Sequence, residues 1–453
     1  MSSTELAPSP APVGAEITTA LRTTTDAAAR WKLATRVVFR FCFVYFTLYC
    51  LYTQIIESFV PLPFAQDWPD PSTLPPMRQL VHWTATHMFG VKTQLVNSGS
   101  GSGDKTWDWV LMFCLLVVSL LATTIWSALD RRRSNYVMLH KWFRLGLRFA
   151  LASQMLIYGL AKAVPLQMPF PYLYRLLEPY GNRSPMGVLW DSVGASPGYE
   201  IFAGCAETFG GILLFFPRTM VFGALVCLAD LLQVFMLNMT YDVPVKLFSL
   251  HLILISLVLL APELRRLKDF FFGNHLVQPS RQPMIGRTQK RARIALALQA
   301  VLGLWLLGAN AYDSWKLWYQ YGGGRPKSTL YGIWDIEEFS QDGNLRAALV
   351  TDNERFGRAI FDFTDSVQFE KMDNTFAGYG AAIDDAKKTI TLTKSSDKNF
   401  KASFTYHRDG DQLTLDGDMD KHKLHLKLHR VDRTKFLLVS RGFHWIQEYP
   451  FNR

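Results

Sequence analysis

The chain has 453 residues, of which 48 are lysine or arginine and 38 are aspartate or glutamate, giving a formal net charge of +10. This length predicts two or more domains. Most of the excess positive charge lies in short loops beside long apolar runs, which favours an orientation signal in a membrane over a nucleic-acid-binding surface. The five cysteines all lie in apolar runs without a CxxC motif, which excludes a zinc finger or a disulfide framework.

The N-terminal two-thirds of the chain has the pattern of a membrane protein. Residues 1–30 are rich in Ala, Pro, Ser and Thr and predict a disordered cytoplasmic tail. Residues 31–315 form the predicted transmembrane helical domain, since a spanning helix needs about 20 mostly apolar residues. Seven runs qualify as spans: 35–57, 107–128, 142–163, 198–216, 219–240, 246–262 and 292–312.

Clusters of lysine and arginine flank alternate ends of these spans. Among them are Arg131 to Arg133 after the second span, Arg265, Arg266 and Lys268 after the sixth, and Lys290, Arg291 and Arg293 before the seventh. An N-terminus in the cytoplasm places every cluster on the cytoplasmic side. Seven spans then deliver the C-terminal domain to the outer side. Two long outer loops are predicted, 58–106, with a short helix around Met77–Phe89, and the aromatic, proline-punctuated 164–197 at the membrane interface.

From residue 326 to 453 the pattern changes to alternating apolar and polar residues in runs about ten residues apart. This pattern predicts eight or more short antiparallel strands and a small closed β-barrel. The strand LYGIWDI, with Gly332 and Trp334, and a late strand with Arg441 resemble the lipocalin-type arrangement. In that arrangement an arginine packs over the tryptophan at the barrel floor. We therefore predict an extracytoplasmic, lipocalin-like barrel with Gly332, Trp334 and Arg441 at its closure.

Polar residues inside the predicted spans mark candidate sites, because they are costly in a bilayer. Helical spacing and depth place the candidates in the middle-to-outer half of one bundle. The predicted ligand-lining residues are Gln154, Tyr158, Lys162, Glu207, Asp230, Gln233, Tyr241, Asp242, Lys246 and His251. Glu207 and Asp230 carry this hypothesis, since two carboxylates at mid-membrane require a counter-charge, a bound proton or water.

Each candidate also has a structural interpretation. Lys162 and Lys246 lie at outer helix ends, where lysines are more often interfacial anchors than site residues. His251 is as typical of a hydrogen bond between helices as of a functional base, and Gln154 also fits a hydrogen bond across helices. The carboxylates would then form buried pairs with histidine or lysine that fix helix packing. No phosphate-binding, dinucleotide-binding, HExxH or GxSxG motif occurs, so catalytic residues stay unknown. His422, His425 and His429 do not share one strand face, which favours an exposed basic strand over a metal site.

The stretch from Leu156 to Lys268 resembles the DoxX-like family of bacterial membrane proteins. The residues that carry the resemblance are YGLAKAVPLQMP (158–169), YGNRSPMGVLW (180–190), AETFGGILL (206–214) and NMTYDVPVKLFSLHLILISLVLLAPELRRL (238–267). The resemblance implies a four-helix core in the bacterial cytoplasmic membrane. The first two spans, the seventh span and the periplasmic barrel extend beyond that core.

Two functions from different classes follow. In the first, the bundle binds a quinone or another lipophilic ligand in its outer half as a redox-associated component, with Glu207, Asp230 and His251 exchanging protons. In the second, the chain is a non-enzymatic accessory or assembly protein whose barrel binds a partner or lipid. The expected partners are membrane lipids and a protein bound through the outer β domain, with no nucleic acid. Whether the chain is an enzyme stays open.

Overall fold

The structure is a computed structural model that describes residues 30–59, 70–97, 99–273, 277 and 288–452. The chain divides into two compact units built from interleaved segments. The first unit comprises Met1–Met155, Gly210–Phe235 and Pro244–Leu306. The second unit comprises Leu156–Phe209, Met236–Val243 and Leu307–Arg453, and it contains the β domain. The predicted tail of residues 1–30 lies, apart from Arg30, outside the described residues.

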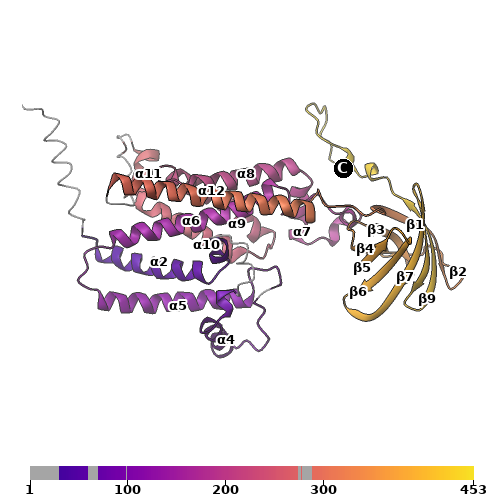
Figure 1. The fold of residues 1–453 in the computed structure, drawn as a ribbon, viewed down its shortest axis with the longest axis horizontal. Helices are drawn as coiled ribbons and strands as arrows, with labels where there is room; N and C mark the ends of the chain where they lie inside the picture. The colour runs from indigo at the N-terminus through magenta and orange to yellow at the C-terminus, as the bar shows by residue number, and fades with distance from the viewer. Residues whose placement is uncertain (1–29, 60–69, 98, 274–276, 278–287, 453) are drawn as a thin grey trace, which may run out of the picture. The chain divides into compact units, whose positions relative to one another are not determined.

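Helices precede the β domain, and a helix covers most of each predicted span (Figure 1). The long helices are α2 (Leu33–Leu51), α5 (Thr106–Leu129), α6 (Val137–Ala163), α8 (Pro197–Leu213), α9 (Met220–Thr240), α10 (Lys246–Leu260) and α12 (Gln289–Gln320). Shorter helical segments are α3 (Ile55–Phe59), η2 (Pro71–Thr73), α4 (Met77–His87), η3 (Leu173–Leu176), η4 (Tyr180–Asn182), α7 (Pro185–Gly194), η5 (Ala261–Glu263) and α11 (Leu264–Phe272).

Five helical stretches within the described residues are long and apolar enough to cross a membrane: α2, α5, α9, α10 with its continuation to Phe272, and α12. Only 33% of the most apolar window of α5 is buried, and Leu116, Leu120, Leu121 and Ile125 are exposed, as suits contact with lipid. The other two predicted spans form helices as well. However, α8 has only 17 residues, and α6 carries four basic residues: Lys141, Arg144, Arg148 and Lys162. That these two helices cross the membrane therefore stays a prediction.

The β domain is a closed antiparallel barrel, as predicted (Figure 1). Its strands are β1 (Gly332–Gln341), β2 (Asn344–Leu345), β3 (Phe356–Phe361), β4 (Ser366–Lys371), β5 (Phe376–Asp384), β6 (Thr389–Lys394), β7 (Asp397–Asp409), β8 (Gln412–Met419) and β9 (His422–Arg430). They pair in the order β2-β1-β3-β4-β5-β6-β7-β8-β9, and β1 also pairs with β9. Eight strands thus close the barrel, while β2 pairs with β1 only.

Alternation along the strands builds the barrel core, because successive side chains point to opposite faces. In β9, Leu424, Leu426 and Leu428 are buried while the neighbouring Lys423 and Lys427 are exposed. Trp334, Phe339, Phe361, Phe369 and Phe404 belong to the same buried cluster. The turn between β1 and β2 has positive φ at Asp342 (53°) and Gly343 (82°), the pair of conformations that two-residue hairpin turns favour.

The prediction that a late strand carries Arg441 over the tryptophan was wrong. Because β9 already pairs with β1, the closed barrel offers no edge for a further strand. Residues after β9 form η6 (Arg433–Lys435) and α13 (Leu437–Ser440), and Arg441 lies 4.8 Å from the Phe451 ring centroid instead. The cation over Trp334 is Arg408, at 5.4 Å from the ring centroid. Trp334 itself is fully buried and donates its indole N–H to the Leu330 carbonyl at 2.8 Å.

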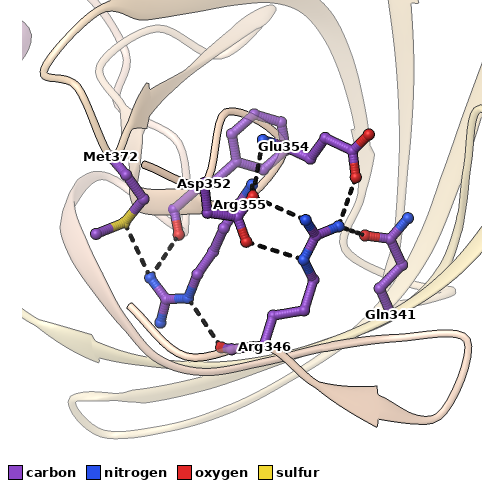
Figure 2. Close-up of polar contacts among 7 residues, drawn as sticks. Gln341, Arg346, Asp352, Glu354, Arg355 and Met372 are labelled. Carbon is purple, nitrogen blue, oxygen red and sulfur yellow. Dashed lines mark hydrogen bonds and ion pairs between the residues drawn. The ribbon is translucent and has the colours of Figure 1, made fainter. Parts of the chain in front are cut away.

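A polar network ties the β1–β2 hairpin to the start of β3 (Figure 2). Arg346 donates to both carboxylate oxygens of Asp352, at 2.8 and 2.9 Å, and to Glu354 and Gln341, each at 2.5 Å. Arg355, 3% exposed, donates to the Arg346 carbonyl at 3.2 Å. Burial acts to raise the pKa of Asp352, but hydrogen bonds from the Glu354 and Arg355 backbone and from Arg346 outweigh it and hold the pKa below its ordinary value.

Replacing Asp352 with asparagine is expected to loosen residues 346–356 in a pH-dependent manner. Because the folded-state pKa is depressed, the carboxylate stabilises the fold above its unfolded pKa, and this contribution is lost as the pH falls through the folded pKa. We expect a loss of about 1 kcal/mol at neutral pH and a smaller loss at about pH 3. Hydrogen-exchange protection of this segment in wild type and variant checks it. An equal loss at both pH values would contradict the assignment.

Candidate functional site

The ten predicted ligand-lining residues are divided between the two units. The second unit contains Tyr158, Lys162, Glu207, Tyr241 and Asp242, and the first contains Gln154, Asp230, Gln233, Lys246 and His251. Their assembly into one pocket therefore stays a prediction. Within each unit, however, the structure shows what the buried members contact.

In the second unit, Lys162 and Glu207 form a buried ion pair. The Lys162 Nζ donates to Glu207 Oε2 at 2.9 Å, and the two residues are 7% and 6% exposed. The ammonium also lies 5.9 Å from the Tyr158 ring centroid, within the range of a cation–π contact. The counter-charge that Glu207 requires is thus a lysine on the neighbouring helix.

Glycines bring α6 and α8 close enough for this pair. A Cβ on Gly204 would lie 2.2 Å from the Ala163 nitrogen, and a Cβ on Gly159 would lie 2.5 Å from Thr208 Oγ1. The two backbones therefore touch where the side chains are absent, a packing mode typical of membrane helices. Lys162 and Glu207, each three residues beyond one of these glycines, consequently face one another.

Glu200 fixes the other end of the same helix pair. Its side chain is fully buried, and Oε1 accepts a hydrogen bond from the Met168 backbone N–H at 2.8 Å. The carboxylate thereby holds the beginning of the 164–197 segment against α8. Glu200 lies seven residues before Glu207 and so shares its helical face, but the sequence carries no signal for this contact.

In the first unit, His251 joins α10 to α2. Its Nδ1 lies 2.7 Å from the Leu247 carbonyl, so Nδ1 carries the proton and Nε2 accepts from the Tyr45 hydroxyl at 2.8 Å. The Tyr49 ring stacks on the imidazole at a centroid distance of 4.2 Å and an interplanar angle of 9°. His251 is 5% exposed, and both its nitrogens have protein partners.

Gln154 and Lys246 also have partners within the first unit. Gln154, 1% exposed, accepts from Gln54 at 3.3 Å and donates to Ser58. Asp104 accepts from the backbone N–H groups of Lys246 and Leu247 at 2.8 and 2.9 Å, and so caps the start of α10. Asp104 follows a Gly/Ser run with no helical pattern, so the sequence carried no signal for this role.

The remaining candidates are less enclosed. Asp230 is half-buried in α9, and Gln233 one turn later is exposed. Tyr241 is half-buried just after α9 ends. Asp242 is exposed and has a positive φ of 53°, which ends the helical path at that point.

A second contact region fastens the 164–197 segment to the barrel, and sequence reasoning did not find it. We call it the loop–barrel joint and define it by five residues: Tyr172, Leu173, Arg325, Asp362 and Phe363. Asp362, 7% exposed, accepts from the Leu173 backbone N–H at 2.7 Å and from Arg325 at 2.5 Å. The Arg325 guanidinium lies 4.4 Å from the Phe363 ring centroid and 5.7 Å from that of Tyr172. Burial raises the pKa of Tyr172, and the charge of Arg325 partly opposes this shift.

Apolar packing supports the joint. Leu173 is 1% exposed and packs against Ile333 and Ile360, which are buried on β1 and β3. Partners in this joint are far apart in sequence, so only the folded chain brings them together.

Among the described residues no group of three or more His, Cys, Asp or Glu side chains is placed to hold a metal. His422 instead binds Asp342 at 2.7 Å, and His425 binds Asp416 at 2.5 Å, on an exposed part of the barrel.

Comparison with known proteins finds a relative that matches part of the chain. No family model matches the chain. Over 124 residues it is 30% identical to the uncharacterized protein YwoB of Bacillus subtilis (strain 168), and this covers 27% of the chain and 79% of YwoB. The chain belongs to the YwoB family. Because YwoB is uncharacterized, membership transfers no activity, and no solved structure matches the chain.

Proposed function

We propose that the chain is a non-enzymatic accessory protein of the membrane, whose working part is the barrel. The observation that carries this proposal is the loop–barrel joint, in which buried Asp362 binds both Leu173 and Arg325. A joint of this kind holds the barrel in a set position against a segment that connects two helices. The polar candidates Glu207, His251 and Gln154 are engaged with neighbouring helices, as a scaffold requires.

In this proposal the membrane core is a DoxX-like four-helix unit formed by α6, α8, α9 and α10. Its support is the sequence resemblance over Leu156 to Lys268, a range that runs from the end of α6 into α11, together with the glycine contact between α6 and α8. The additional helices and the barrel would adapt this unit to a partner.

We further propose that the barrel is extracytoplasmic, in a bacterial cytoplasmic membrane. Helix α12 supports this orientation. It begins with Lys290, Arg291 and Arg293, while Tyr312, Trp315 and Tyr319 are exposed towards its other end. Cationic residues favour the cytoplasmic side, and exposed aromatic residues favour a membrane–water interface.

One barrel cysteine tests orientation and partner together. Lys387→Cys lies in the turn between β5 and β6, where the lysine side chain is 78% exposed. A membrane-impermeant maleimide should label it in spheroplasts, whereas Arg132→Cys, exposed between α5 and α6, should react only after permeabilisation. The reverse pattern would overturn the orientation.

The same Lys387→Cys protein, carrying a photo-crosslinker, should give one defined protein adduct. Asp362→Ala should reduce that adduct without reducing labelling of the cysteine, because only the joint is lost. Adducts with lipid alone would contradict a protein partner.

A second candidate function is binding of a quinone or another lipophilic ligand in the outer half of the bundle. Glu200 favours this ligand function. Burying its carboxylate fully near a helix end costs free energy, and packing alone rarely accounts for such a cost. Mass spectrometry of lipids extracted from the purified protein, with its visible spectrum, separates the two. Stoichiometric quinone would favour the ligand function over the accessory function.

A further inference from the structure

A large cavity lies within the first unit, between α6, α9, α11 and α12. Its volume is about 1660 Å³. Ordinary small-molecule pockets occupy about 300–1,000 Å³, so this cavity has room for a larger, elongated ligand. None of the residues predicted to line the outer half of the bundle lies on its wall.

Much of the cavity wall is apolar. Aromatic and aliphatic side chains from three of the helices and the loop before α9 form it, including Phe216, Phe222, Leu225, Phe270, Phe271 and Leu296. Several of these, such as Phe222 and Phe270, are more than half exposed, at 56% and 67%. Surfaces of this kind accept hydrocarbon chains.

The polar part of the wall is cationic. Among the described residues, no aspartate or glutamate lines the cavity. The basic residues that line it are Lys141, Arg144, Arg148, Arg218, Arg266 and Arg293. Glu263 lies behind this wall, 2.5 Å from Arg266 and 3.9 Å from Arg144, and so offsets part of the charge. The remaining excess favours a ligand with negative charge.

Arg148 gives the sharpest indication. It is 4% exposed, and its guanidinium donates to the Phe215 carbonyl at 3.2 Å and to the Gln299 side chain, both neutral oxygens. Its Nε, like that of Arg144, makes no hydrogen bond within the described part of the chain. A buried guanidinium without a carboxylate partner is costly, and an anionic group in the cavity would remove that cost.

Helix α11 indicates the depth of the cavity. Its sequence LRRLKDFFF is amphipathic, with Phe270, Phe271 and Phe272 exposed and Arg265 and Lys268 also in contact with solvent. Because α11 ends the apolar stretch that begins with α10, its basic side chains favour the level of the lipid head groups at the end of that stretch. The cavity wall includes Arg266, Leu267, Phe270 and Phe271 of this helix, and so opens at the same level.

We propose that this cavity binds an anionic phospholipid, with the phosphate at Arg144 and Arg148 and the acyl chains along the phenylalanine-lined wall. Basic pockets between membrane helices are suited to such head groups. The apolar wall selects a lipid over a soluble phosphate compound, since a soluble compound leaves this wall without a partner.

Thermal unfolding of the full chain in detergent, with added lipid, tests the proposal. Phosphatidylglycerol should raise the midpoint temperature in a saturable manner, while phosphatidylcholine with the same acyl chains should not. Inorganic phosphate at equal concentration should also have no effect. Equal shifts with both lipids, or a full shift with phosphate alone, would overturn the proposal.

Variants locate the effect. Arg148→Met should raise the phosphatidylglycerol concentration that gives half of the temperature shift at least tenfold. Arg265 is an exposed residue of α11 outside the cavity wall, so Arg265→Met should leave that concentration unchanged. Should Arg148→Met fail to fold, the exposed cavity residue Arg293→Gln replaces it, with a severalfold weakening expected. Unchanged responses in the cavity variants that fold would refute the site.

Discussion

Alanine at position 204 is expected to force α6 and α8 apart. The new Cβ would lie 2.2 Å from the Ala163 nitrogen and 2.5 Å from the Gly159 carbonyl oxygen, both backbone atoms that no side-chain rotation can move away. Inserting one carbon into a packed contact costs about 1–3 kcal/mol, and contacts this short place Gly204→Ala at or above the upper end. Thermal unfolding in detergent, followed with the yield of folded protein, measures the loss.

Gly146→Ala is the matched control, because it lies in α6 with nothing within 4 Å of the new Cβ. Glycine is about 1 kcal/mol less favourable than alanine inside a helix, so this variant should be neutral or slightly stabilised. Similar losses for both variants would show that the close contact does not govern stability.

Removal of one partner of the Lys162–Glu207 pair should have an effect of similar size. Glu207→Ala leaves the Lys162 ammonium buried without its 2.9 Å partner, and breaking a buried pair in this way costs about 3–5 kcal/mol. The double variant Lys162→Met, Glu207→Leu removes both charges and should recover most of the stability. Wild type, Lys162→Met, Glu207→Leu and the double variant form a double-mutant cycle, for which we expect a large coupling free energy.

The result separates the two interpretations of Glu207. If Glu207 lines a ligand site, its substitution would abolish ligand binding while the protein keeps its stability. The second substitution at Lys162 would then not restore ligand binding. If Glu207 serves packing, its substitution lowers the stability of the protein, and the second substitution at Lys162 restores most of that stability. We expect the second outcome.

Local patterns predicted the elements well. Long apolar runs place the helices, since hydropathy is a property of neighbouring residues, and period-two alternation in KLHLKLH places β9 with Leu424, Leu426 and Leu428 inside. The α6–α8 contact was also foreseeable in part, because Gly204 shares a helical face with Glu207.

Contacts that depend on distant segments were not predictable. Arg441 was assigned to the tryptophan because a strand was expected there, whereas the closure of β9 on β1 ends the sheet at Arg430. Asp362 and Leu173 are 189 positions apart, and neither residue type signals the other. Arg144 and Arg148 lie at the start of a predicted span and fit the orientation pattern of basic residues, yet they are 8% and 4% exposed. The positive-inside rule uses only the position of a basic residue along the chain, and it does not indicate in which direction the side chain points.

Closure of the barrel also limits how another protein can recognise it. Many domains capture an extended peptide by strand addition, which needs an open sheet edge with unpaired backbone groups. The eight strands that close this barrel present no such edge, and β2, the one strand paired on a single side, spans two residues. A partner of this barrel must therefore read side chains, and its specificity will respond to single surface substitutions rather than to backbone complementarity.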